Sequence, residues 1–190
     1  MSIRGNFVAL QAETLVEEWF NRNGYFTIRG IKDKIDEMDI LAIKNLGQHG
    51  WDCVHCEVQV SIRPVGYISK LTSDLVNELG VKSNTSAKLR TDAQIEICAK
   101  QWVANKFTVQ KKQQLRNQLV PNYDWRYLFV HGNVKDTKEL DYIFLEGIKL
   151  LPFKQLLNDL CTKQTQLEFV GSSAGDLVEM INFIQDESFE

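Results

Sequence analysis

The chain has 190 residues, of which 44% are hydrophobic and 25% are charged, a composition that suits one domain with a sizeable core. No apolar run approaches the roughly 18 residues that would span a bilayer. The short, polar N-terminus is unlike a secretory signal, so we expect a cytoplasmic protein with no membrane partner.

The first third of the chain is predicted to form a helix and a three-stranded meander. Residues 7–21 are amphipathic, and Asn23-Gly24 is a typical helix end because glycine tolerates positive φ. Apolar or alternating runs predict strands at 25–31, 38–44 and 51–62. The last two strands are separated by a loop that contains Asn45, Gly47 and Gly50, which indicates a hairpin.

The rest of the chain alternates helices with single strands. A polar, basic loop at 81–91 leads into a long helix at 93–119, for which Thr91 and Asp92 are both candidate caps. The other expected elements are helices at 69–79, 138–146, 153–161 and about 174–185, and strands at 125–131 and 147–151. This order predicts a single α/β domain over residues 1–190, with a central mixed sheet flanked by helices.

Several enzyme classes lack their sequence signature here. No Gly-x-Gly-x-x-Gly or P-loop motif follows a predicted strand, which argues against a nucleotide-binding fold. No Gly-x-Ser-x-Gly elbow accompanies the histidines, so a serine hydrolase has no support. Cys53 and Cys56 lie three positions apart on a predicted strand and therefore point to opposite faces, which is unsuitable for zinc.

The predicted hairpin brings two acids and one amide together. Asp39 opens one apolar strand, while Glu57 and Gln59 lie on the neighbouring strand. Carboxylate and amide oxygens are ligands that hard cations such as Mg²⁺ prefer. Asp36, one short turn earlier, is the rival for Asp39, which we prefer because it directly adjoins the apolar run.

Polar residues occupy one face of the strand that carries Glu57. Side chains alternate along a strand, so His55, Glu57 and Gln59 share a face, while the intervening valines and cysteine pack a core. A functional site is one explanation for this polar face, and a water-exposed edge is the other. On the first explanation His55 contacts substrate or an ordered water; on the second it is a surface residue.

This pattern resembles the PD-(D/E)XK nuclease superfamily, whose core is a helix, a three-stranded meander, a helix and a further strand. Its motif is an acidic residue followed downstream by Asp/Glu-x-Lys, and here Asp39 is followed by Glu57-Val58-Gln59. Holliday-junction resolvases of this superfamily often carry a Glu on the first helix, where Glu13 stands relative to Gly24. The likeness covers about residues 5–62, with weaker support to about 160, and it implies a restriction-endonuclease-like sandwich.

The resemblance implies a Mg²⁺-dependent (or Mn²⁺-dependent) endonuclease that hydrolyses DNA phosphodiester bonds. Asp39 and Glu57 would bind the ion with the backbone carbonyl of Val58, and Glu13 would bind it through water or hold a second ion. A divalent cation lowers the pKa of its bound water and neutralises developing charge. Enzymes of this class that cut both strands usually pair two active sites, so a homodimer is compatible with this function.

Gln59 departs from the motif, which has lysine at that position. An amide can orient a water by hydrogen bonding but cannot carry charge or take a proton at neutral pH. Some restriction enzymes of the superfamily use Glu-x-Gln, so catalysis with Gln59 as the water-orienting residue is our first hypothesis. The alternative is a catalytically inactive DNA-binding or accessory protein of a mobile element or defence system.

Positive charge is concentrated in the middle of a chain whose net charge is −3. Residues 82–126 contain nine Lys or Arg against three Asp or Glu. In a nuclease this region would follow the DNA backbone, and a solvated helix surface is the alternative explanation. The candidate DNA-contacting residues share this positive charge; they are Arg63, Lys88, Arg90, Lys106, Lys111, Lys112 and Arg116.

Overall fold

The chain folds around one mixed sheet with the strand order β1-β2-β3-β4-β5, as seen in a computed structural model that describes residues 3–33, 36–61, 63–162, 167 and 173–186. The first three strands form an antiparallel meander, and the last two run parallel to β3. The strands are β1 (Phe26–Asp33), β2 (Asp36–Asn45), β3 (Trp51–Gln59), β4 (Trp125–His131) and β5 (Lys149–Pro152). This confirms the expected α/β class with a central mixed sheet.

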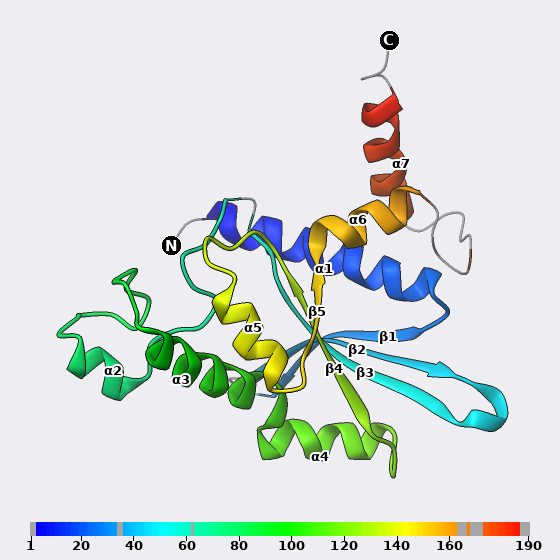
Figure 1. Cartoon of the computed structure of the whole chain (residues 1–190). Helices are drawn as coiled ribbons and strands as arrows, with labels where there is room; N and C mark the ends of the chain where they lie inside the picture. Colours follow the sequence, from blue (N-terminus) through cyan, green and yellow to red (C-terminus); the bar gives the residue numbers. More distant parts are fainter. Residues whose placement is uncertain (1–2, 34–35, 62, 163–166, 168–172, 187–190) are drawn as a thin grey trace.

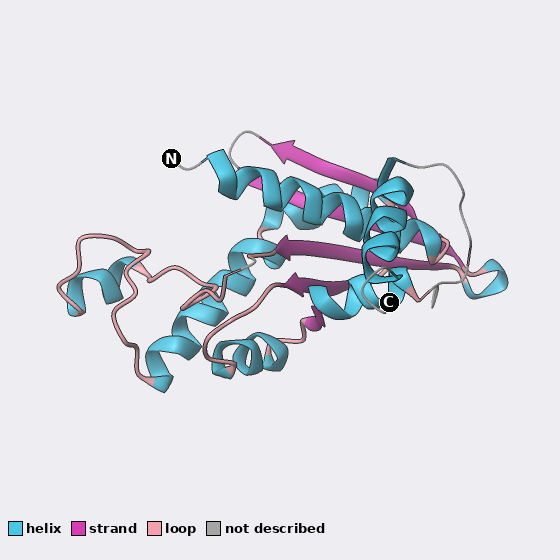
Figure 2. Cartoon of the chain, turned by 90° about the horizontal axis from the view of Figure 1, so that it is seen from above, coloured by secondary structure: helices cyan, strands magenta, loops and turns pink. Residues whose placement is uncertain are grey.

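Helices cover both faces of the sheet (Figures 1 and 2). In the view of Figure 1, α1 and α6 lie above the sheet and α4 lies below it. The helices are α1 (Ile3–Arg22), α2 (Ser73–Glu78), α3 (Asp92–Val103), the π-helical turn η2 (Ala104–Thr108), α4 (Gln110–Leu119), α5 (Lys138–Leu145), α6 (Phe153–Cys161) and α7 (Ser173–Asp186), with a 3-10 turn η1 (Gly47–His49) between β2 and β3. Within the described ranges, no helix combines the length and the apolar character that crossing a membrane requires.

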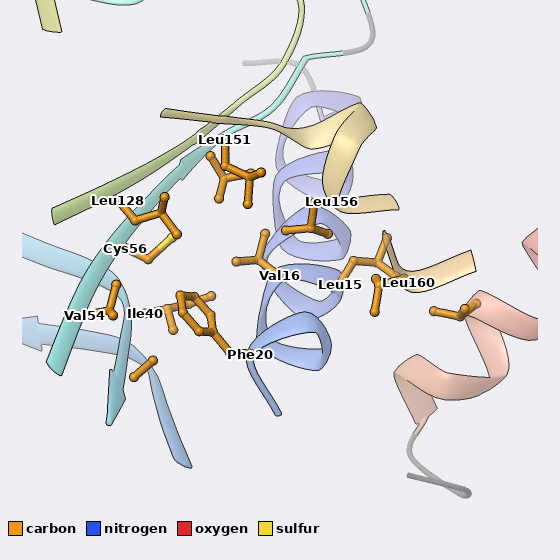
Figure 3. Packing of buried hydrophobic residues seen from close by; sticks show 13 residues of the cluster. Leu15, Val16, Phe20, Ile40, Val54, Cys56, Leu128, Leu151, Leu156 and Leu160 are labelled. Atoms are coloured by element: carbon orange, nitrogen blue, oxygen red, sulfur yellow. The ribbon is translucent and has the colours of Figure 1, made fainter. Parts of the chain in front are cut away.

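Strand alternation divides the core into two clusters on opposite faces of the sheet. On β4, Leu128 and Val130 join the cluster under α1 and α6, whereas Phe129 joins the cluster under α3 and α5. Figure 3 shows the first cluster, in which Val16 and Phe20 of α1 face the sheet. Each face is therefore covered by helices, so even polar residues of β3 such as His55 and Glu57 are buried.

The turn between β2 and β3 fixes the register of the predicted hairpin. The Asn45 side-chain oxygen accepts a hydrogen bond from the backbone N–H of Gly47 at 2.6 Å, and Gly47 has φ +65°. Gly50 has φ +83°, and a Cβ there would lie 2.8 Å from the Tyr123 hydroxyl. Glycine is thus required at Gly50 both by its backbone conformation and by its close neighbour.

The prediction of one uninterrupted helix at 93–119 is wrong. It is divided into α3, η2 and α4, and the break falls at Val109, whose ψ of 133° is extended. Thr108 and Val109 are adjacent β-branched residues, which have low helix propensity. Of the two candidate caps, Thr91 caps α3, because its hydroxyl accepts the N–H of Gln94 at 3.3 Å. The other differences are smaller: β3 ends at 59 rather than 62, and α2 spans 73–78 rather than 69–79.

Candidate functional site

Asp39 and Glu57 lie beside each other on β2 and β3. The antiparallel register pairs Ile40 with Cys56, and the next position along this register places Asp39 opposite Glu57. The backbone N–H of Val58 donates a hydrogen bond to the Asp39 carboxylate at 2.7 Å. The prediction that the hairpin brings these two acids together is therefore confirmed.

Glu57 is the centre of a buried network of charged groups. Its side chain is 1% exposed, and both of its carboxylate oxygens are occupied. Lys106 Nζ, from η2, lies 2.5 Å from Oε2, and Lys112 Nζ, from α4, lies 3.3 Å from Oε1. His55 Nε2, two residues away on the same face of β3, lies 3.0 Å from Oε1.

His55 connects Glu57 to a second cation. Its Nδ1 lies 2.9 Å from a terminal nitrogen of Arg116, which is always a donor. Nδ1 must therefore accept, and Nε2 carries the proton that it donates to Glu57. Burial lowers the pKa of His55, the hydrogen bond and the charge of Glu57 oppose this, and the charges of Arg116 and Lys112 add to the lowering. The pKa therefore lies below its usual value, and the ring is neutral at pH 7. Arg116 also donates to the Tyr127 hydroxyl at 3.2 Å.

The network keeps Glu57 ionised and Lys106 protonated. Burial by itself would raise the pKa of Glu57, but the hydrogen bond from His55 and the charges of Lys106 and Lys112 hold that pKa below its usual value. Burial likewise works against the charged form of Lys106, yet the carboxylates of Glu57 and Asp39 raise its pKa. Lys106 is therefore a fixed positive charge, unsuited to act as a base.

Asp39 has the opposite electrostatic character to Glu57. Burial and the negative charge of Glu57 raise the pKa of Asp39 to about 7, and the charge of Lys106 and the Val58 N–H only partly offset this. An ionised Asp39 thus lies in a position that lacks sufficient positive charge. Such a carboxylate is stabilised by any cation that binds beside it.

The protein should become less stable between pH 4 and pH 8 because of Asp39. Its pKa is about 7 when folded against an ordinary value of 3.8, so the stabilising contribution is complete below about pH 3.8 and is lost as the pH rises to about 7. The difference corresponds to at most about 4 kcal/mol. In Asp39→Asn, which retains an acceptor for Val58, we expect this loss to be absent when urea unfolding is measured at both pH values. Equal pH profiles for the two proteins would contradict the assignment.

An open cavity of about 750 Å³ meets this network at Lys106, although neither Asp39 nor Glu57 lines it. Lys106, whose side chain is 35% exposed, lines the cavity, and so does Gln59, whose amide donates to the Ile68 carbonyl at 3.4 Å. Other residues of the lining are Lys70, Thr72, Gln101 and Asn105. The cavity is thus lined by a neutral amide and by the ammonium group that pairs with Glu57.

The remaining proposed ligands are less directly placed. Glu13, on α1, is half-buried, and burial together with Glu37 raises its pKa; Glu57 contributes to the same shift, so Glu13 lies within electrostatic reach of the site. Val58 contacts Asp39 through its N–H, and its carbonyl as a metal ligand stays a prediction. Asp36 begins β2, but its side chain lies outside the described part of the chain.

The polar face of β3 is not an exposed edge. β3 is the central strand, and α4 and η2 cover its polar face, so His55 and Glu57 are fully buried while only Gln59 is exposed. The explanation of His55 as a surface residue or as a direct substrate contact is therefore wrong. His55 acts on Glu57 through a hydrogen bond inside the protein.

The predicted DNA-contacting residues fall into two groups. Arg90, Lys112 and Arg116 are buried and hydrogen-bonded to other parts of the chain, so the prediction that they belong to an exposed basic surface along the DNA backbone is wrong. Of these three, Arg90 lines a cavity. Arg63, Lys88 and Lys111 are exposed, and for them the prediction stands untested. Lys106 is half-buried against Glu57 rather than part of a surface track.

One feature of the sequence could have indicated the buried cations, but the strongly polar composition of α4 made it look like a surface helix. Lys112 and Arg116 are spaced i, i+4, which places both on one face of α4. The apolar stripe that runs through α3 and η2 stops after Phe107, and the residues of α4 are almost all polar, so α4 has little apolar surface to turn toward the sheet. A polar helix that packs on a buried acid must present cations, because buried charges require partners.

The acids near β2 and β3 do not form a complete metal cage. Across the ranges that the structure describes, no group of three or more His, Cys, Asp or Glu side chains is arranged to hold a metal ion. Asp39 and Glu57 are, however, adjacent all-oxygen donors, and Mg²⁺ is often held by one or two carboxylates, with water and substrate phosphate completing its shell. The pair therefore fits a substrate-assisted Mg²⁺ site but not a closed three-acid cage.

Comparison of the sequence with protein-family models, with curated proteins and with solved structures returned no match.

Proposed function

We propose that this protein is a divalent-metal-dependent nuclease that hydrolyses DNA phosphodiester bonds at Asp39, Glu57 and Lys106. The observation that carries the proposal is the convergence of two carboxylates and one fixed ammonium group beside an open polar cavity. The order of a helix, an antiparallel meander, helices and a parallel strand supports it, since the PD-(D/E)XK core has the same order. The restriction-endonuclease-like fold is itself part of this proposal.

Asp39 and Glu57 would hold the metal, which when bound would activate a water and neutralise charge on the phosphate. The high pKa of Asp39 favours this role, because the ionised form of that residue is short of positive charge. Lys106 now occupies one oxygen of Glu57 and would have to give up that contact, at least in part. Glu13 would contribute through its charge from α1.

Lys106 would supply the positive charge that Gln59 lacks. Its ammonium group stays protonated and half-exposed at the cavity, where it can interact with a non-bridging phosphate oxygen. Preorganised charge of this kind stabilises a developing anion because it needs no reorganisation during reaction. Gln59, on the wall of the same cavity, can hydrogen-bond to the attacking water.

The experiment is a cleavage assay with duplex, single-stranded and branched DNA in Mg²⁺ or Mn²⁺. Asp39→Asn should retain the fold, because the Asn side chain can still accept the Val58 N–H, yet lose activity by about 10²-fold or more. Glu96→Gln, which removes an acid from an exposed pair with Lys100, is the matched control and should leave the rate unchanged. An Asp39→Asn protein that cuts at the original rate would overturn the proposal.

A non-cleaving DNA-binding protein is the second candidate, and a specific observation favours it. Both oxygens of Glu57 are already paired with cations from the chain itself, and the motif position is Gln59. Such pairing can neutralise the acid without any metal. DNA binding without cleavage of any of the three substrates, in either metal, would favour this candidate.

A further inference from the structure

Arg90 is a buried cation without a carboxylate partner. It lies in the loop before α3, is 5% exposed, and makes no ion pair with any residue that the structure describes. A terminal guanidinium nitrogen donates to the Ser69 carbonyl at 3.1 Å, and the guanidinium carbon lies 3.9 Å from the centre of the Tyr67 ring. Its Nε is buried and has no partner. A buried charge in this condition favours binding of an anion.

Arg90 lines a small polar cavity of about 270 Å³. Besides Arg90, its lining contains one further cation and several hydroxyl groups, from Tyr67, Ser69, Lys70, Thr85 and Ser86, together with Gln59, Gly66, Ile68 and Ala87. Lys70 is exposed and has no ion pair within the described ranges. Two cations and several hydroxyl donors around a cavity of this size match the chemistry of a phosphate group.

Glu139, from α5, holds one wall of this cavity in place. One of its carboxylate oxygens accepts the N–H of Ile68 at 2.6 Å, and the other accepts the N–H of Ser69 at 2.8 Å and the Ser69 hydroxyl. Glu139 is 2% exposed and reaches Arg90 only through Ser69. This wall is therefore fixed before a ligand binds, and both carboxylate oxygens of Glu139 already accept hydrogen bonds from it.

The small cavity adjoins the larger one that leads to Glu57. Gln59, Ile68 and Lys70 line both of them, so the cavity of Lys106 and the cavity of Arg90 are neighbours. We propose that the Arg90–Lys70 cavity binds a backbone phosphate of the nucleic-acid strand whose neighbouring phosphodiester lies at Asp39, Glu57 and Lys106. That the bound phosphate belongs to a nucleic acid rests on the proposed function, whereas the binding of a phosphate-like anion in this cavity does not.

The first arm of the test uses inorganic phosphate, followed by NMR chemical shifts of the wild-type protein and two variants. Lys70→Ala removes an exposed ammonium group without breaking an ion pair, so the variant should fold. Lys82→Ala is the matched control, because Lys82 is exposed in the same region but does not line either cavity. Phosphate should shift signals around Ser69 and Arg90, and Lys70→Ala should weaken this binding about fivefold or more while Lys82→Ala leaves it unchanged.

The second arm uses a fluorescent single-stranded oligonucleotide in EDTA, which prevents cleavage. Loss of one phosphate contact should reduce the slope of log K against log salt by about 0.7 in Lys70→Ala but not in Lys82→Ala. Equal behaviour of the two variants in both arms would overturn the proposal. Loss of phosphate binding with an unchanged oligonucleotide slope would overturn the nucleic-acid assignment.

The two arms also separate this inference from the proposed function. If phosphate binding depends on Lys70 but the protein cuts no DNA, the proposed anion site is supported and the proposed nuclease activity is rejected. If DNA cleavage depends on Asp39 but Lys70→Ala changes neither phosphate nor oligonucleotide binding, the nuclease activity is supported and the anion site is rejected.

Discussion

Replacement of Glu57 with alanine should destabilise the protein by about 3–5 kcal/mol, the usual effect of removing one partner from a buried ion pair. The variant would leave Lys112, which is 5% exposed, without its only carboxylate contact among the described residues. It would also remove the acceptor for the His55 N–H. Urea unfolding at pH 7 measures the change as a lower midpoint at an unchanged slope.

Asp39→Asn is the control for this prediction, because it alters the neighbouring acid without removing an acceptor from a buried cation. We expect this variant to be at least as stable as the wild type at pH 7, since the ionised Asp39 is disfavoured there. A loss below about 1 kcal/mol in Glu57→Ala would contradict the buried network as described. The role of the acids in DNA cleavage is therefore better tested by substituting Asp39 than Glu57, because removal of Glu57 also destabilises the fold.

Replacement of Lys106 with methionine should lower DNA cleavage by about 10²–10³-fold, as expected for loss of a preorganised charge at a reacting phosphate. The same change should tighten Mn²⁺ binding several-fold, because the ammonium group that now lies 2.5 Å from Glu57 would no longer compete for that oxygen. Calorimetric titration of Mn²⁺ and single-turnover cleavage measure the two effects separately. Opposite changes in affinity and rate are not expected from a residue that only supports the fold.

A second substitution tests whether charge is what Lys106 supplies. Gln59 lines the same cavity, so Gln59→Lys in the Lys106→Met background returns an ammonium group to the position where the related motif has lysine. We expect this double variant to recover part of the lost rate. If Lys106→Met loses metal affinity together with activity, Lys106 positions Glu57 for the metal instead of competing with it.

The pairing of the acids was predictable because it depends on local chemistry. Asn45, Gly47 and Gly50 set the turn, and strand alternation then decides which side chains share a face. Asp39 and Glu57 therefore meet through the register of one hairpin. No contact with distant parts of the chain is needed to reach that conclusion.

The partners of Glu57 could not be predicted, because they depend on where a helix breaks. As part of one uninterrupted helix, Lys106, Lys112 and Arg116 would be read as positions on a solvated surface. The π-helical turn holds Lys106 against Glu57, and the extended Val109 redirects α4 across β3, which brings Lys112 and Arg116 inward. Tertiary packing of this kind outweighs the pattern of charge along the chain.

The Arg90 cavity was beyond sequence analysis for a related reason. Its wall is held by Glu139, which lies 70 residues from Ser69 in the chain. The positive charge of Arg90 was visible, but its burial was not, because a loop residue before a helix cap is usually exposed. Only the fold shows that this buried cation lines a cavity together with Lys70.

The most direct test of the central claim is the anomalous density from Mn²⁺ in crystals of the wild-type protein. The account predicts a peak in contact with carboxylate oxygens of both Asp39 and Glu57, with Lys106 moved away from its present position 2.5 Å from Glu57. Manganese bound only elsewhere, with Lys106 still paired to Glu57, would contradict the account.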